Sequence, residues 1–360
     1  MILTIILVII IFSFLVIAHE FGHFIVARRN GVQVDEFGIG FPPKLWGRQK
    51  GKTLYTINAL PLGGFVRLKG EQGESDAADS FASKGAWIKT KILLAGVTMN
   101  LLIAYVIITG LLMVGVPPLL GNLPKVGSIA PTTGSTKLIV VEVTPESLAA
   151  HNGIATGTRL ISIDGTELKS PDDLRAQLSD RAGRVVRLVI LNGDKQQTLT
   201  LNLPQKQDDQ ALLGVATIPE ALQRYPWYAA PIAAFLVILN LVWATLAAFG
   251  DMIVGLFTKA QVSQAVTGPI GITVIFSQVL KLGLVYVLGL VASISLSLAI
   301  INALPLPALD GGRLAVVILQ RLGVRITDRV EAIIHTAGFV ALIGLMIIVS
   351  LADVFRLGAR

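Results

Sequence analysis

The sequence of 360 residues contains no cysteine, and only 15% of its residues are charged. The absence of cysteine excludes disulfide bonds, thiolate catalysis, iron–sulfur clusters and cysteine-ligated zinc sites. Any bound metal must therefore be held by histidine, aspartate or glutamate. A soluble globular protein carries about 25% charged residues, whereas 53% of this chain is hydrophobic. The composition predicts a polytopic α-helical membrane protein.

The formal net charge is +7, which in a soluble protein would suggest a nucleic-acid partner. In a membrane protein, lysine and arginine accumulate in loops on the cytoplasmic side, so we expect no nucleic-acid partner here. Residues 28–91 are rich in both and are predicted to be a cytoplasmic loop. A second basic group precedes the last apolar run and predicts the same side for that loop: Arg313, Arg321, Arg325 and Arg329.

The first apolar run begins at Ile2 and continues up to Arg28. It is long enough to cross a bilayer, which takes about 20 residues. It has no charged leader of the signal-peptide kind, so we interpret it as a retained helix. A second span is expected roughly over Ile92 to Val116, where Pro117-Pro118 stops it.

Residues 123–218 have a different pattern. Short β-type runs alternate with turn signals, Asp164-Gly165 and Asn192-Gly193, and with one helix-like stretch, SPDDLRAQLSD. This pattern predicts an inserted soluble α/β domain, which lies outside because it follows the second crossing. It separates an N-terminal membrane part, 1–122, from a C-terminal membrane part, 219–360.

The C-terminal part contains four apolar segments, at 228–249, 268–280, 284–304 and 333–354. The chain must cross the membrane once or three times between the soluble domain and the basic loop at Arg313. Because 268–280 is short for a bilayer, we expect one crossing, at 284–304. Segment 228–249 is then held against or partly in the membrane, although it is long enough to span. The predicted fold therefore has four core transmembrane helices.

The first span contains the sequence His19-Glu20-Phe21-Gly22-His23. Histidines four residues apart share one face of a helix, so both imidazoles can bind one cation. Glu20 lies beside them and is free to take a proton from water, which is the H-E-x-x-H pattern of zinc metalloproteases. Ionisable groups inside a span are functional candidates by default; the alternative is that these are interfacial anchors facing lipid headgroups. Of the other histidines, His151 is expected at the surface and His335 at the membrane interface.

A catalytic zinc usually has three protein ligands and one water. Asp310 is the candidate third ligand, in the sequence NALPLPALDGG. Pro305 and Pro307 prevent a regular helix, and Gly311-Gly312 let the backbone turn sharply. Irregular backbone at membrane depth is tolerated only where it is buried in protein or lines a wet cavity. The alternative is an ordinary turn that ends a helix.

These two motifs, at residues 19–23 and 302–311, resemble those of the site-2 proteases, which are intramembrane zinc metalloproteases. The resemblance is to the bacterial members that regulate sigma factors, and it covers most of the chain. It implies that the inserted domain is a single PDZ-like domain and that the cofactor is Zn²⁺. The resemblance implies that His19, His23 and Asp310 are the zinc ligands and that Glu20 is the general base. It also implies that Asn302 contacts the substrate backbone.

The segment Leu54 to Gly70 resembles the membrane-associated β-hairpin of this family, whose edge strand pairs with an unwound substrate. Its Gly63-Gly64 pair between β-prone runs suits a hairpin turn, and an open edge suits strand addition. Gly63, Gly64 and Phe65 are thus candidate substrate-binding residues, with a hairpin of no substrate role as the alternative. TGPIGI, Thr267 to Ile272, resembles a turn of the family with a structural or gating role. In GVTMN, Val97 stands where members often have proline, ahead of Asn100.

The resemblance implies a single-span membrane protein as substrate, such as an anti-sigma factor already cut by another protease. It implies a bacterial inner membrane, with the active site towards the cytoplasm, the PDZ-like domain outside and lipid around the spans. Two other functions fit some of the same residues. A metal transporter also places histidine and acidic residues within spans, and a non-catalytic scaffold could act through the PDZ-like domain alone.

Overall fold

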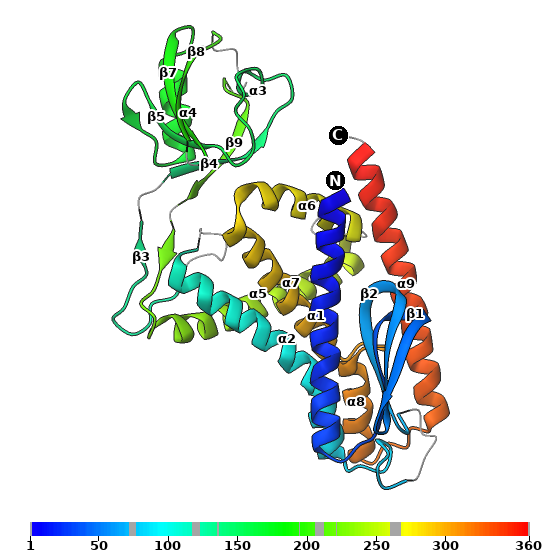
Figure 1. Ribbon diagram of the computed structural model, residues 1–360. Coiled ribbons are helices and arrows are strands. Elements are labelled where there is room, and N and C mark those ends of the chain that lie inside the picture. Colours follow the sequence, from blue (N-terminus) through cyan, green and yellow to red (C-terminus); the bar gives the residue numbers. More distant parts are fainter. Residues whose placement is uncertain are drawn as a thin grey trace. The chain divides into compact units, whose positions relative to one another are not determined.

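The computed structural model (Figure 1) describes residues 2–71, 77–116, 123–134, 137–193, 195–205, 212–220, 222–259 and 268–358. The chain forms two compact units, the first made of Met1–Val106, Leu241–Val274 and Val291–Arg360, the second of Ile107–Asn240 and Ile275–Leu290. All four boundaries between the units run through helices, so the predicted domain limits at 122 and 218 stay predictions. The proposed stop at Pro117-Pro118 and Thr267 of TGPIGI lie outside the described residues.

Five helices in the described part of the chain are long and apolar enough to cross a membrane. They are α1 (Ile2–Arg29), α2 (Ala86–Val114), α5 (Ala230–Lys259), α7 (Leu284–Ala303) and α9 (Asp328–Gly358). A sixth apolar helix, α6 (Pro269–Leu282), is shorter, as its sequence predicts. The protein is thus a multi-pass membrane protein. Length does not separate a helix that crosses from one that lies against the bilayer, so the core of four spans stays a prediction.

The second unit contains a mixed α/β module that corresponds to the predicted soluble domain, and we call it the soluble module. Its antiparallel sheet has the order β8-β7-β5-β4-β9, with β6 paired to β5. The strands are β4 (Lys137–Val143), β5 (Arg159–Ile163), β6 (Thr166–Glu167), β7 (Val185–Asn192), β8 (Lys195–Asn202) and β9 (Val215–Glu220), and the helices are α3 (Leu148–His151) and α4 (Pro171–Asp180). A further short pair joins β3 (Thr132–Thr133) to β10 (Gln223–Arg224). The four β-type runs that the sequence shows all form strands, which confirms an α/β module.

Local signals explain why this module folds where the sequence predicts. The side chain of Ser170 accepts a hydrogen bond from the N–H of Asp173 at 3.0 Å, and Pro171 begins α4, so the helix has a good N-cap and first residue. The predicted turn between β5 and β6 is present, with positive φ at Asp164 (49°) and Gly165 (83°). Leu174 and Leu178 of α4 are buried in the apolar core that the helix shares with the sheet.

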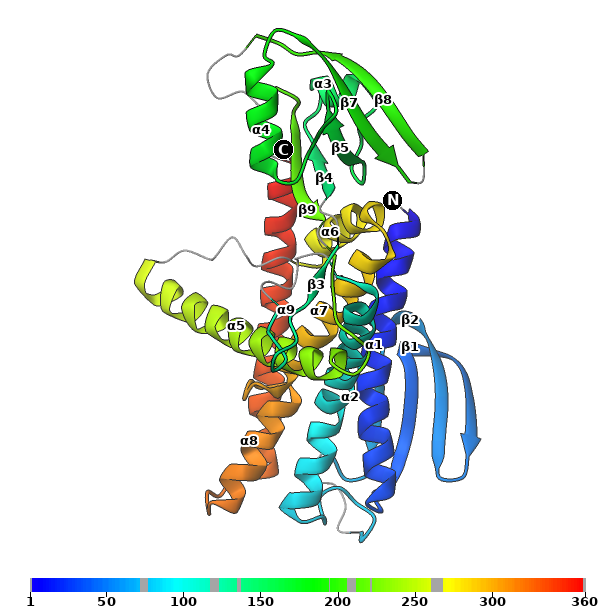
Figure 2. The same cartoon turned by 90° about the vertical axis from the view of Figure 1, so that its left-hand side faces the viewer.

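In the first unit, α1 lies between α2 and a β-structure made of two long strands (Figures 1 and 2). The strands are β1 (Val34–Lys50) and β2 (Thr53–Leu68). The two strands pair antiparallel. The start of β1 has a neighbouring segment of β2 on each side, so Phe37 lies opposite Tyr55 on one side and opposite Val66 on the other. The two halves of β2 therefore flank the start of β1, and the end of β1 pairs with the outer half of β2.

This register corrects one expectation. The predicted hairpin over residues 54–70 is wrong, because Leu54–Ile57 and Gly64–Leu68 pair with β1 and not with each other in the described ladder. Gly63 and Gly64 do not form a tight hairpin turn. They permit close approach to α1 instead: a Cβ on Gly63, where φ is 112°, would lie 2.8 Å from the side chain of Val16. The start of β1, which lies between the two halves of β2, comes from outside the predicted segment.

An apolar cluster fixes the strands against the helices of the first unit. It contains Phe24 of α1, Phe37 of β1, Leu68 of β2, Ile92 of α2 and Val317 of α8 (Asp310–Arg321), together with Phe81 from the connection between β2 and α2. The cluster buries large side chains next to the segment of α1 that carries His19 and His23. The cluster therefore packs four elements, β1, β2, α2 and α8, around the part of α1 that carries the histidines.

Candidate metal centre

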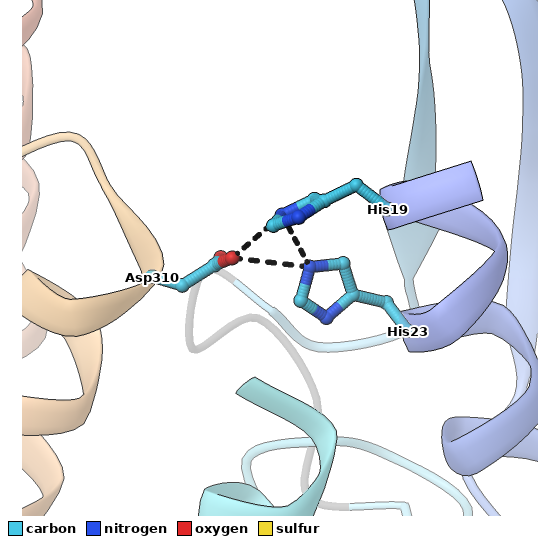
Figure 3. A group of neighbouring side chains, drawn as sticks. All are labelled: His19, His23 and Asp310. Atoms are coloured by element: carbon cyan, nitrogen blue, oxygen red, sulfur yellow. Dashed lines mark hydrogen bonds and ion pairs between the residues drawn. The ribbon is translucent and has the colours of Figure 1, made fainter. Parts of the chain in front are cut away.

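His19 and His23 project from the same face of α1 and meet Asp310, the first residue of α8 (Figure 3). The Nε2 atom of His19 lies 2.9 Å from Oδ2 of Asp310, and Nε2 of His23 lies 3.1 Å from the same oxygen. The two Nε2 atoms are 3.2 Å apart. Both histidines are buried. Residues that are far apart in the sequence thus bring three metal-ligand atoms together, as the sequence predicts.

The separations fit a zinc ion. With zinc about 2.0–2.1 Å from each ligand atom, the edges of a tetrahedral site are on the order of 3.3 Å. The three edges here are 2.9 to 3.2 Å. A His₂Asp set leaves a fourth position for water or substrate, which is the arrangement of catalytic zinc sites.

The outer nitrogen of each histidine also fits metal binding. Nδ1–H of His23 donates to the backbone oxygen of Ile92 at 2.7 Å, which leaves the lone pair of Nε2 for a metal. Nδ1 of His19 lies 3.5 Å from the side-chain amide of Asn100. The Oδ1 atom of Asn100 is buried and has no partner among the described residues. Turning that amide over places Oδ1 where it accepts Nδ1–H of a metal-bound His19.

Because Gly96 on α2 has no side chain, the Nε2 atoms of His19 and His23 can lie directly against this helix. A Cβ at this position would lie 2.5 Å from Nε2 of both His19 and His23. Gly22 on α1 has a matching role, since a Cβ there would lie 2.5 Å from the backbone oxygen of Ala95. The two helices therefore approach closely at the metal centre because both contact positions are glycine.

Asp310 is presented by a compact turn after α7. The N–H of Leu306 donates to the oxygen of Leu304 at 2.7 Å, and Ala308 adopts a left-handed conformation with φ of 71°. A Cβ on Gly311 or Gly312 would collide with the backbone carbonyls of this same turn. The irregular backbone expected from the proline and glycine residues is therefore present, and it is packed against its own following helix.

Arg313 anchors the start of α8 beyond the metal centre. Its guanidinium forms an ion pair with Glu71, which follows β2. Burial lowers the pKa of this guanidinium, but the carboxylate of Glu71 outweighs burial, and the pKa lies above its usual range. The pair links the helix that carries Asp310 to the end of the β-structure.

Glu20 lies between the histidines and the β-structure. Its Oε2 atom accepts a hydrogen bond from the N–H of Val66 at 3.1 Å. Val66 belongs to Gly64–Leu68, the half of β2 that pairs with β1 on one side only. The carboxylate therefore contacts the free edge of this strand, and the edge faces the metal centre.

The remaining candidates are placed as follows. Asn302 is half-buried in the last turn of α7, ahead of the turn that leads to Asp310. Phe65 stacks on Phe41 within the β-structure, with ring centroids 6.3 Å apart. His151 is exposed on the soluble module, as expected. His335 is outside the ligand group: its Nδ1 accepts the N–H of Ala308 at 2.9 Å.

Sequence reasoning assigned no role at this site to three residues that shape it: Gly96 was not singled out, Asn100 was only named within GVTMN, and His335 was expected at the membrane interface. The first two are four residues apart on α2, and a glycine and an asparagine on one helix face is a signal that could have indicated them. The contact of His335 depends on how the last helix packs, and the sequence carries no comparable signal for it.

Comparison with known proteins agrees with this geometry. The profile of peptidase family M50 matches residues 7–345. A Clostridium perfringens protein provisionally named a zinc metalloprotease is 33% identical over 345 residues, which cover 95% of this chain and 96% of that protein. The chain therefore belongs to peptidase family M50, the family of the site-2 proteases, and it is a zinc metalloprotease by family.

Two further relatives have more specific names. The regulator of sigma-W protease RasP of Bacillus subtilis is 27% identical, covering 98% of this chain and 99% of that protein. The regulator of sigma E protease of Salmonella typhi is 26% identical, and the match covers 95% of this chain and 96% of that protein. Among solved structures, the PDZ domain of an SdrC-like protein of Listeria monocytogenes matches 24% of the chain at 21% identity with a TM-score of 0.21, covering 93% of that domain. A likeness at this level does not assign the fold of the soluble module.

Proposed function

We propose that this protein is an intramembrane zinc metalloprotease that hydrolyses peptide bonds within transmembrane segments in regulated intramembrane proteolysis. The observation that carries the proposal is the convergence of His19 and His23 with Asp310 beside Glu20, on a helix whose other charged residues lie only in its last turn. Family membership in M50 supports the same chemistry. It speaks against a metal transporter and against a scaffold without catalytic activity.

In this proposal, His19, His23 and Asp310 hold the zinc ion. When bound there, zinc would supply a Lewis acid for the scissile carbonyl and for the attacking water. Glu20 takes a proton from the attacking water and delivers it to the leaving nitrogen, as a general base and then a general acid. Asn302 contacts the substrate backbone near the scissile bond and stabilises the developing negative charge.

The free edge of Gly64–Leu68 supplies the place where substrate binds. A transmembrane helix hides its carbonyls in its own hydrogen bonds, so it must unwind before it is cut. Pairing of the unwound segment with an edge strand replaces the lost hydrogen bonds. The hydrogen bond from the N–H of Val66 to Glu20 supports this step, because it shows that the edge strand directly contacts the proposed general base. Gly63, Gly64 and Phe65 line or shape this edge.

The proposed substrate is a single-span membrane protein, of the anti-sigma-factor type that the names of the two bacterial regulators suggest. In this proposal the active site faces the cytoplasm and the soluble module is a PDZ-like domain outside. This domain excludes substrates whose ectodomain has not been removed by an earlier cut. Deleting Gly127 to Pro204 should then admit full-length substrate; unchanged rejection would contradict the filter without touching the chemistry.

The deciding experiment compares wild type with Glu20→Gln on a single-span reporter in detergent, with zinc content measured in both. We expect wild type to cut within the span, and the variant to bind zinc without cutting. The matched control is Glu142→Gln, because Glu142 is an exposed glutamate of β4 in the soluble module. Cutting by Glu20→Gln at the wild-type rate would contradict the assigned base, and the absence of cutting by zinc-loaded wild type would contradict the protease.

A further inference from the structure

A groove runs between α1 and α2 on the surface of the first unit. Its volume is about 550 Å³, within the range of about 300–1,000 Å³ that ligand pockets have. The α1 residues that line it are Gly22, Ile25, Val26 and Arg29. The α2 residues that line it are Trp87, Thr90, Lys91, Leu94, Ala95, Thr98, Met99 and Leu102. The groove is not part of the metal centre.

One end of the groove is basic and aromatic. Arg29 ends α1, and Lys91 lies in the second turn of α2. Both are exposed, and neither forms an ion pair with another described residue. Trp87 is 65% exposed, and the Lys91 ammonium lies 5.4 Å from the centre of its ring. Tryptophan and basic residues are enriched at the ends of membrane spans, where they contact lipid headgroups.

The rest of the groove is apolar. Its floor is formed where Gly22 packs on the backbone of Ala95, and its far end is Leu102. The hydroxyl of Thr98 donates to the backbone oxygen of Leu94 at 2.8 Å, so it presents no free donor to the groove. Between Lys91 and Leu102 the helix rises on the order of 16 Å. This length and polarity suit an acyl chain below a charged headgroup.

The groove lies on the opposite side of α1 from the β-structure. Successive residues of an α-helix are about 100° apart, which puts the four groove residues of α1 on one face. Val16, Ile17 and Glu20, which contact β2, lie on the other face. Both views show α2 and the strands on opposite sides of α1 (Figures 1 and 2). A substrate paired with the edge strand would therefore not occupy the groove.

We infer that this groove binds one anionic phospholipid of the surrounding bilayer. The phosphate lies between Arg29 and Lys91, Trp87 packs on the headgroup region, and one acyl chain follows the apolar floor to Leu102. The charge of the rim complements an anionic phosphate, and a zwitterionic lipid adds a second cation that the rim repels. The bound lipid would pack along α1 and α2, which approach closely beside the metal centre at Gly22 and Gly96, and so hold these two helices together.

The test measures lipid retained by the purified full chain, using native mass spectrometry with phosphatidylglycerol added in detergent. We expect one tightly bound phosphatidylglycerol per chain and weaker binding of phosphatidylcholine. Arg29→Gln with Lys91→Gln should reduce the affinity for phosphatidylglycerol by roughly tenfold or more. Thr98→Trp, which fills the floor and leaves the rim intact, should also reduce it.

Matched controls separate the groove from general attraction to the membrane. Arg28→Gln with Lys89→Gln removes the same charge from the same helix ends, but these cations lie over Phe24 and Phe81 and outside the groove. Val106→Trp adds the same bulk at an exposed position of α2 beyond it. Equal losses in variants and controls would overturn the proposal, as would equal binding of the two lipids. Capture of a substrate peptide, and not of lipid, by a photo-reactive residue at Leu102 would overturn it too.

Discussion

The imidazole of His335 accepts a hydrogen bond from the backbone N–H of Ala308, with 2.9 Å between the two nitrogens. Ala308 has a φ of 71°, which is costly for a residue other than glycine and persists only where its surroundings impose it. Nearby, a Cβ on Gly338 would collide with Pro307, so α9 packs directly on this turn. The last helix therefore holds the backbone that presents Asp310 to the two histidines.

We predict that His335→Ala weakens zinc binding although His335 is not a ligand. The variant leaves the N–H of Ala308 without its acceptor, at a cost of about 1–3 kcal/mol, and the turn that carries Asp310 loses its support. Thermal unfolding with and without zinc, and zinc competition with a chelator, would measure both effects. Ile334→Ala is the control, since Ile334 is 40% exposed on the same helix. An unchanged zinc affinity in His335→Ala would show that the turn holds without this bond.

Gly96→Ala should abolish zinc binding. Its added methyl group would lie 2.5 Å from Nε2 of both histidines, so both imidazoles would have to swing away from the position in which they meet Asp310. The protein should still fold, because the helix propensity of alanine exceeds that of glycine. The control is Gly110→Ala on the same helix, where a Cβ meets nothing within 4 Å. Zinc content per purified chain checks the prediction, and a normal content in Gly96→Ala would contradict the geometry of the site.

The meeting of His19, His23 and Asp310 could be predicted because each of the two motifs is a local pattern in the sequence. Four-residue spacing puts His19 and His23 on one helix face, and the proline and glycine residues around Asp310 exclude a regular helix. The structure confirms that the three side chains meet. The strands of the soluble module were predictable for the same reason, since each run and its turn signal lie together in the chain.

The remaining features depend on contacts between distant segments. The start of β1 inserts between the two halves of β2, and no pattern within residues 54–70 indicates that a third segment will separate them. Likewise, Gly96 and Asn100 acquire their roles only because α2 crosses α1 at the histidines. Whether α5 crosses the bilayer is set by its environment, and its apolar sequence fits either arrangement.

Asn100→Leu should reduce zinc affinity by roughly 10- to 100-fold, the usual effect of losing a partner that orients a metal-bound histidine. The variant preserves approximate side-chain volume but removes the oxygen that accepts Nδ1–H of His19. Asn100→Asp retains an acceptor and should retain most of the affinity. Zinc competition against a chelator measures both variants. If both lose zinc equally, the acceptor has no specific role and Asn100 contributes through packing alone.

Val66→Pro should stop cleavage of a transmembrane reporter while zinc stays bound. Proline removes the N–H that points from the free edge to Glu20, and it obstructs pairing with an added strand. The ladder to β1 should survive, because this N–H points to Glu20 and away from β1. Val66→Ala retains the N–H and should cut normally. Cleavage at the wild-type rate by Val66→Pro would show that substrate does not bind along this edge, whereas loss of zinc would show that the strand supports the metal centre itself.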